Sequence, residues 1–477
     1  MKKKMRVMAT VFALSMALTT LSACGGGSGS KDAKSSSNTE DPNAKDTITA
    51  LLPPVSANFQ NNFAQMEKDF NAKYPNLTLK IEPASWEDIN QKLDTQVNAG
   101  SPPDIAFRPS EEISKYVENG VLMDISDVAT ADMIKDYDPA PLEYMKNGKG
   151  LYGFPAYMEA HAIGGNKEFM EKASIDYQKV QKEGWTFDEF RDAIKKGVAT
   201  ENGKTTRYGF VFATAGVTSK DYLGILVKSA GMPAAFTKDL KYAYTSKNFL
   251  EVLKDIRLMI DDGSMPKELS SIDAGKRWNM FLTGQTMITG KGLAVFERNA
   301  KLNSEKLKNK DDSAVKGSIP VNYVVLPIPS FSGAQAQAAV AVDGYVTFQA
   351  TKDVSAAHKA NVVKAANFLS SGKVAATTNN ELYVAQITES SRKAAESMPD
   401  DRDPGNKAAV EAMLKTAVPA RPDIPTDLGA KAIKLEDEVI VPKLQALIAG
   451  EMTPEAMYDA VKSAAIQAFG DDGVVKD

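Results

Sequence analysis

Cysteine and histidine are scarce in this chain of 477 residues, which contains one cysteine and two histidines. One cysteine cannot form a disulfide bond within the chain, and these three residues are too few for a Cys/His metal cluster. A surplus of either charge is also missing, since 57 basic side chains face 61 acidic ones and the formal net charge is −4. The sequence thus lacks the basic excess typical of nucleic-acid-binding proteins. We expect no metal, no cofactor and no nucleic-acid partner.

The overall composition is that of an ordinary soluble protein. Hydrophobic residues make up 43 % of the chain and charged residues 25 %. These values exclude a disordered chain, a collagen and a multi-span membrane protein. At about 100–200 residues per domain, the length favours two or three domains.

Motifs of several enzyme classes are missing as well. Neither His161 nor His358 belongs to an H-E-x-x-H pair, and a G-x-S-x-G turn and a G-x-x-x-x-G-K-[ST] phosphate loop are absent. We interpret each histidine as a polar residue with satisfied hydrogen bonds, not as a catalyst. Paired carboxylates for glycoside hydrolysis remain open, because the distances between the 61 acidic residues are not visible in a sequence.

The N-terminus has the layout of a secretory signal. Four basic residues within the first six are followed by an apolar run, residues 7–20, which is shorter than the ~20 residues of a spanning helix. The next residues, Leu21-Ser22-Ala23-Cys24, resemble the lipobox of bacterial lipoprotein signals. This resemblance implies cleavage after residue 23 and a diacylglycerol group on the sulfur of Cys24.

Residues 24–46 are predicted to be a flexible tether behind the lipidated Cys24. They are rich in Gly, Ser, Asn, Asp and Lys without apolar periodicity, a composition that behaves as a flexible coil. Loss of the signal removes four basic residues and takes the net charge from −4 to −8. We therefore expect lipid, not charge, to hold the protein on the outer face of the cell membrane.

The body of the chain alternates between strand and helix patterns. Strand patterns at residues 47–52, 77–81 and 104–107 are separated by two helical patterns. In the first of these, Phe59, Phe63, Met66 and Phe70 are spaced as one apolar face of a helix. In the second, residues 85–88 resemble a capping box. This order predicts an α/β fold with ligands at the carboxyl ends of the strands.

Later segments continue the same pattern. A second capping box is predicted at Thr186–Glu189, strands at residues 321–328 and 339–348, and a last helix with Thr453 as N-cap and Pro454 at its first position. No repeat of fixed period is present. The chain is most simply two α/β lobes.

Several segments together resemble the extracellular sugar-binding lipoproteins of ABC importers, the family of the maltodextrin-binding proteins. The resemblance covers about 400 residues and rests on the order and spacing of these elements: 86–105 with its Pro-Pro-Asp-Ile turn, 120–125, 150–155 with Asn166-Lys167, 185–190, 281–287, 326–329 and 450–460. In the fourth element, Trp185 and Thr186 stand in the reverse of the family's order.

The resemblance implies a bilobal periplasmic-binding-protein fold joined by a multi-strand hinge. We expect an N-terminal lobe of residues 47–156 plus 328–388 and a C-terminal lobe of residues 157–327 plus 389–477. The lobes are expected to close over a sugar or oligosaccharide and to dock on ABC permease subunits. The protein is then a monomeric binding protein and not an enzyme.

Ten residues are candidate ligand contacts, most of them from their place in the resemblance. Trp86 either stacks on a sugar or packs at a helix start, and Arg108, Ser110 and Glu111 follow the Pro-Asp turn as hydrogen-bonding residues or as a solvated loop. Arg108 stands where maltodextrin binders carry Trp, which argues against maltodextrin itself. The other candidates are Tyr157, Glu159, Trp278, Lys291, Asp343 and Tyr345.

Three other functions remain open. The first is the same fold with a non-sugar ligand such as a polyamine, an iron complex or a peptide. The absence of an adjacent tyrosine pair argues against iron, and the carboxylates Glu111, Glu159 and Asp343 are compatible with a polyamine. A secreted glycoside hydrolase or lyase would use a carboxylate such as Glu159. A surface adhesin would bind no small ligand.

Overall fold

The computed structural model describes residues 44–56, 58–86, 88–215, 218–331, 337–350 and 354–476. These residues belong to one compact unit, Pro42–Asp477. The predicted signal, Cys24 and nearly all of the tether lie outside the described residues. Within the described ranges, no helix combines the length and the apolar character that crossing a membrane requires.

The first main sheet contains five strands from both halves of the chain. Their order is β2 (Leu77–Pro83), β1 (Asp46–Leu52), β3 (Ile105–Pro109), β12 (Val340–Thr347) and β6 (Gly153–Ala160). β1 runs parallel to β2 and β3, whereas β12 runs antiparallel to β3 and β6. The predicted strand–helix alternation therefore produces a parallel core, to which a returning segment adds antiparallel strands.

The second main sheet also contains five strands. Their order is β11 (Tyr323–Leu326), β7 (Ala162–Asn166), β10 (Thr286–Gly292), β9 (Lys204–Phe212) and β8 (Ala199–Glu201). The chain changes sheet between β6 and β7, after a single intervening residue, His161. The predicted boundary between residues 156 and 157 falls inside β6. A small separate sheet pairs β4 (Lys146–Asn147) with β5 (Gly150–Leu151).

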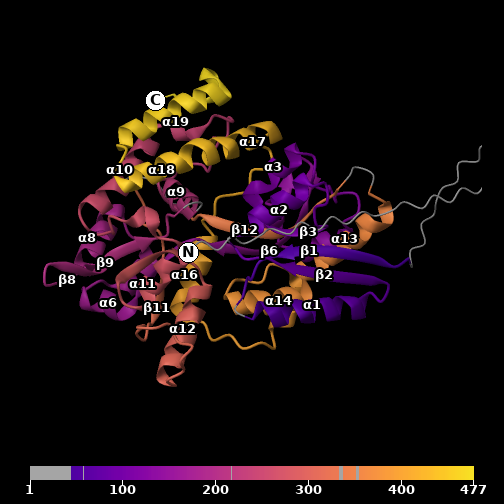
Figure 1. The fold of residues 1–477 in the computed structure, drawn as a ribbon, viewed down its shortest axis with the longest axis horizontal. Coiled ribbons are helices and arrows are strands. Elements are labelled where there is room, and N and C mark those ends of the chain that lie inside the picture. Colours follow the sequence, from indigo (N-terminus) through magenta and orange to yellow (C-terminus); the bar gives the residue numbers. More distant parts are fainter. Residues whose placement is uncertain are drawn as a thin grey trace, which may run out of the picture. The chain divides into compact units, whose positions relative to one another are not determined.

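Helices cover both main sheets and form two large apolar cores. The core of the first sheet includes apolar residues of α1 (Phe59–Lys73), α2 (Ile89–Asn98), α3 (Ile113–Glu118), α4 (Ala131–Asp136), α5 (Pro139–Glu143), α13 (Ala356–Ser370) and α14 (Gly372–Leu382). In Figure 1 this group lies to the right, and β12 and β6 extend from it toward the second group.

The second sheet is packed by helices from the middle and the end of the chain. Its core includes residues of α6 (Lys167–Lys172), α7 (Tyr177–Glu183), α8 (Phe187–Gly197), α9 (Thr218–Ser229), α10 (Lys247–Asp261), α11 (Ala274–Leu282), α17 (Thr426–Leu435), α18 (Val441–Ala449) and α19 (Pro454–Phe469). A smaller apolar cluster joins β11 to α12 (Val295–Lys308) and α16 (Pro404–Leu414), and α15 (Glu389–Ala395) packs on α14.

Short helical turns complete the fold. They are the 3-10 turns η1 (Ser110–Glu112), η2 (Ala243–Thr245), η3 (Leu269–Ser271) and η5 (Asp471–Gly473), and one π-turn, η4 (Glu436–Ile440). The fold thus consists of two α/β bodies, each with its own sheet and core, which confirms the predicted fold class.

Local signals explain where several helices begin. Thr186 accepts a hydrogen bond from the Glu189 backbone N–H at 3.2 Å while the Glu189 carboxylate accepts from the Thr186 N–H at 2.8 Å, so the predicted capping box is confirmed at α8. The predicted box at residues 85–88 differs. Ser85 bonds the Asp88 N–H at 3.1 Å and the Asp88 carboxylate at 2.8 Å, and this turn precedes α2, which begins at Ile89.

Candidate functional site

The candidate site is built at the carboxyl ends of strands in the first sheet. β2 leads into Trp86, and β3 ends in Arg108 and Pro109, directly before η1 with Ser110 and Glu111. β12 places Asp343 beside Pro109 of β3 on one side and Tyr157 of β6 on the other. Segments more than 180 residues apart in sequence therefore meet at one sheet edge, where α/β folds bind ligands.

An aromatic group lies at this edge around Phe107. Its ring contacts Trp86 edge-on at a centroid distance of 6.0 Å, Tyr345 edge-on at 5.7 Å and Tyr157 at 6.1 Å. Trp86 is 49 % exposed, whereas Phe107, Tyr157 and Tyr345 are buried. Trp86 is therefore a large apolar face that rests on the buried ring of Phe107 and is open to solvent, which is the arrangement a stacking residue needs.

Arg108 on β3 contacts α2 and η1. Its side chain is buried, and its terminal nitrogens donate to Asn90 at 2.7 Å and to the Glu112 carboxylate. Burial disfavours the charged guanidinium, but the charge and hydrogen bond of Glu112, together with Tyr116 and Asp343, outweigh this effect, so the pKa of Arg108 is raised. The two terminal nitrogens of Arg108 thus link α2 to η1 and add positive charge near Asp343, while its buried Nε has no partner among the described residues.

Asp343 and Glu159 place two carboxyl groups on the strand pair β6–β12. The Tyr157 hydroxyl donates to the Asp343 carboxylate at 2.6 Å. Burial raises the pKa of Asp343. The hydrogen bond from Tyr157 and the positive charges of Lys291 and Arg108 oppose this rise but do not cancel it. Glu159 is 8 % exposed and accepts from the Ala294 N–H at 3.2 Å. Burial raises the pKa of Glu159 to about 7 despite the charge of Lys291.

Lys291 brings a positive charge from the second sheet near these carboxylates. It lies on β10, and its Nζ is 3.4 Å from Oδ1 of Asp221 on α9. Burial lowers the pKa of Lys291, but the charges of Asp221, Glu159 and Asp343 outweigh it, so the pKa is raised. The pKa of Glu111 is raised by desolvation in the surrounding protein, although part of its side chain is exposed, and the charges of Lys228 and Lys291 oppose this rise.

We call Glu111, Glu159, Lys291 and Asp343 the central cluster. It draws its residues from β3–η1, β6, β10 and β12, that is, from both main sheets. Its carboxylates and ammonium group are partners for hydroxyl groups as well as for charged groups. Ser110 lies half-buried beside it on η1.

Trp278 lies in a packed aromatic stack. Its ring is nearly parallel to those of Phe281, at 5.5 Å, and Phe296, at 4.6 Å, and it belongs to the small apolar cluster around β11. The structure therefore surrounds Trp278 with core aromatics, in contrast to the exposed Trp86.

Three residues near the central cluster were not among the predicted contacts: Asp221, Lys228 and His161. Asp221 and Lys228 are seven residues apart on α9 and so share one face of that helix, but nothing in the local sequence links this helix to β10. His161 was interpreted as satisfied, yet its Nε2 has no hydrogen-bond partner among the described residues. Across the same residues, no group of three or more His, Cys, Asp or Glu side chains is placed to hold a metal ion.

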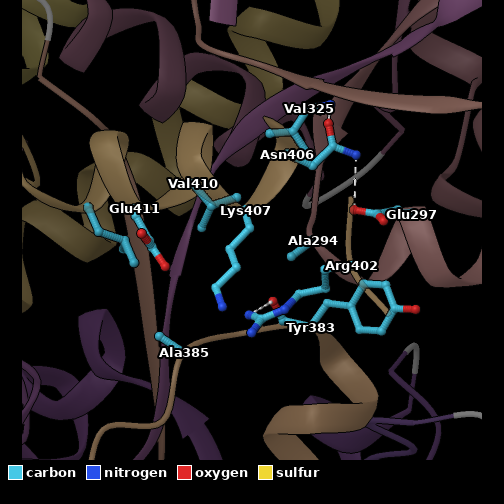
Figure 2. Close-up of a pocket in the computed structure, with 11 residues that line it drawn as sticks. Ala294, Glu297, Val325, Tyr383, Ala385, Arg402, Asn406, Lys407, Val410 and Glu411 are labelled. Atoms are coloured by element: carbon cyan, nitrogen blue, oxygen red, sulfur yellow. Dashed lines mark hydrogen bonds between the residues drawn. The ribbon is translucent and has the colours of Figure 1, made fainter. Parts of the chain in front are cut away.

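Two pockets lie elsewhere in the described residues. The first is between α12, β11, α16 and residues 383–385, and Figure 2 shows Glu297 bonded to Asn406 and Arg402 beside Tyr383 in it. Its open volume of about 30 Å³ holds about one water molecule. The second, a groove of about 680 Å³, runs beside Tyr208 and α11. None of the ten predicted contacts lines either pocket.

Comparison with known proteins gives consistent results. Residues 50–376 match the family model described as bacterial extracellular solute-binding protein. A binding protein of Brucella abortus is 28 % identical over 251 residues, which cover 51 % of this chain and 57 % of that relative. The chain thus spans little more than half the length of this curated relative.

Two solved structures share the fold. An ABC substrate-binding protein from Listeria monocytogenes, solved in complex with cycloalternan, has a TM-score of 0.68 and 20 % identity, with 90 % of this chain and 100 % of that chain covered. A maltose/maltodextrin-binding domain from Bdellovibrio bacteriovorus, bound to maltotriose, has a TM-score of 0.67 and 17 % identity, with 89 % and 100 % covered. At these identities the likeness concerns the fold, and it confirms the predicted solute-binding-protein fold.

The family model covers more than half of the 477 residues, and it includes both main sheets in large part. The chain belongs to the bacterial extracellular solute-binding protein family.

Proposed function

We propose that this protein is the substrate-binding component of an ABC importer and that it captures a sugar or oligosaccharide at the central cluster. The observation that carries this proposal is the family match over residues 50–376. The two fold relatives described above were solved with cycloalternan and with maltotriose, which makes a saccharide the first ligand class to test.

The chemistry of the site supports a polyhydroxy ligand. Trp86 offers an exposed apolar face for the C–H face of a sugar ring. Glu111, Glu159 and Asp343 accept from hydroxyl groups, and Lys291 donates to them. The acidic and basic groups of the cluster already balance one another in part. An uncharged ligand can therefore hydrogen-bond the carboxylates and the ammonium group without adding a charge that lacks a partner.

Binding is proposed to close two lobes, residues 47–156 plus 328–388 and residues 157–327 plus 389–477, around this site. Certain contacts between the two bodies would break in such a motion. The Thr426 hydroxyl donates to the Asn147 side chain at 2.6 Å, the Asn147 amide donates to Ser114 at 3.0 Å, and α17 packs on α3. We infer that an open form breaks this set and that the closed form is recognised by the permease.

The protein is proposed to be a monomeric, non-catalytic lipoprotein on the outer face of the cell membrane. This part rests on the sequence around Cys24, which lies outside the described residues. Incorporation of labelled palmitate into the full-length chain in cells, and its loss in Cys24→Ser, is the expected result. Equal labelling of wild type and variant would contradict the anchor.

Calorimetric titration tests the binding function directly. We expect the full-length chain to bind at least one of maltotriose, cellotriose, xylotriose, raffinose, glucose, galactose and xylose, with a dissociation constant below about 100 μM. The sugar should be recovered unchanged after incubation. Saturable binding of putrescine or spermidine with no sugar bound would overturn the carbohydrate proposal in favour of a polyamine. Release of new reducing ends would instead indicate an enzyme.

A further inference from the structure

His161 continues the row of residues that faces the central cluster. Residues 157, 159 and 161 alternate along an extended segment, so their side chains share one face. The ladder between β6 and β12 pairs Tyr157 with Asp343 and Glu159 with Ala341. It extends by one step, because the His161 N–H donates to the Ala339 carbonyl at 2.8 Å. The imidazole is therefore on the same face as Tyr157 and Glu159.

The strand opposite this row carries small side chains. Directly opposite residues of an antiparallel pair have their side chains on the same face, and the residues opposite Glu159 and His161 are Ala341 and Ala339. Neither alanine has a polar side-chain atom to offer, and neither reaches over the imidazole. The pairing therefore leaves Glu159 and His161 without a polar partner from β12.

The surroundings of His161 match those of Glu111. The charges of Lys291 and Lys228 act on both residues, so His161 and Glu111 approach the same two ammonium groups. His161 is 8 % exposed. Burial and these two cations lower the pKa of His161 well below its usual value, and the imidazole is accordingly uncharged at neutral pH.

The hydrogen bonds of this imidazole are incomplete. Nε2 of His161 is buried and has no partner among the described residues. Buried polar atoms in native proteins are nearly always bonded, and an unbonded one lowers stability. A neutral imidazole both donates and accepts, which is the capacity that recognition of a hydroxyl group requires.

We propose that His161 is a ligand-contacting residue of the central cluster and that its imidazole hydrogen-bonds a hydroxyl group of the bound saccharide. This inference rests on the proposed function, and it adds a specificity-determining residue to it. A ligand that lacks a hydroxyl at this position, or that brings a cation next to Lys228 and Lys291, should bind more weakly.

The variant His161→Leu separates a ligand contact from a packing role. Leucine fills a similar volume and removes the unbonded nitrogen, so we expect the melting temperature of the free protein to stay equal or rise. Calorimetry with the tightest-binding sugar of the panel above should show an affinity loss of about tenfold or more. Equal affinities of variant and wild type would overturn the inference.

Imidazole ¹⁵N NMR of the wild-type chain gives a second test that needs no variant. Only two histidines contribute signals, and His358 serves as an internal control. It lies on α13, and its ring nitrogens bond Asp46, the first residue of β1, at 2.9 Å and Asp104, just before β3, at 3.0 Å. On addition of the same sugar, the His161 signals should shift while those of His358 stay fixed.

The outcomes distinguish the two levels of the proposal. If no panel sugar binds the wild-type chain, the proposed function fails and this inference fails with it. If a sugar binds but the His161 signals do not move, or His161→Leu keeps its affinity, the proposed function stands and the inference alone is wrong.

Discussion

At the scale of single residues, Glu159 is a carboxyl group held where its charge is disfavoured. It is 8 % exposed, it accepts one backbone hydrogen bond, and its pKa is raised to about 7. Such a group lowers the stability of the folded protein when it is ionised. Since a hydroxyl-rich ligand can donate to it, we interpret the raised pKa as a sign of a binding residue kept at some expense of stability.

The variant Glu159→Gln tests this interpretation through pH. Between about pH 4.5 and 7 the folded state retains a proton that the unfolded state releases, so the free energy of unfolding of the wild type falls as the pH rises through this window. The amide of Glu159→Gln does not titrate, so in the variant this fall in the free energy of unfolding is absent. We expect the variant to be more stable than wild type at pH 8, by up to about 3 kcal/mol, and equal to it near pH 4.5.

Urea unfolding at pH 4.5 and pH 8 measures this difference, and Glu143→Gln, at a carboxylate with a side chain 44 % exposed, is the matched surface control. The same Glu159→Gln protein should bind the panel sugar about tenfold more weakly, because its amide oxygen is a weaker acceptor than a carboxylate. A variant that keeps both the wild-type pH slope and the wild-type affinity would contradict the account.

At the scale of elements, local sequence signals predicted the strands and helices best where one apolar face or one cap dominates. Phe63, Met66 and Phe70 are buried along α1 as their spacing predicts, and Thr453 caps α19 by accepting from the Ala456 N–H at 3.1 Å. The start of α2 was placed too early, because the side chains of Ser85 and Asp88 bond each other in a turn ahead of the helix.

Contacts between distant elements were not predictable from local patterns. His358 links α13 to the starts of β1 and β3 through Asp46 and Asp104, 312 and 254 residues away, and these two carboxylates raise its pKa to about 9. Likewise, Asp221 and Lys228 reach the central cluster only because α9 follows β9, which lies beside β10. The residues that flank Asp221 and Lys228 in the sequence give no indication that α9 lies near the central cluster.

At the scale of the whole molecule, the two α/β bodies were predicted correctly. The succession of strands and helices along the chain is indicated by many segments, and their agreement outweighs the weakness of each one. The family resemblance placed Arg108 and Trp278 among the ligand contacts on position alone. The structure gives Arg108 the partners Asn90 and Glu112 and surrounds Trp278 with Phe281 and Phe296. The partners of a side chain depend on the three-dimensional fold, so neither these contacts nor the exposure of Trp86 could be predicted from sequence position.

The most direct test of the central claim is a crystal structure of the full-length chain with the panel sugar that binds most tightly. We expect the sugar to lie against Trp86, with its hydroxyl groups bonded to Asp343, Glu159 and Lys291. A sugar held instead in the groove beside Tyr208, or in the pocket of Figure 2 between α12 and α16, with no sugar at the central cluster, would show that the central cluster is not the binding site.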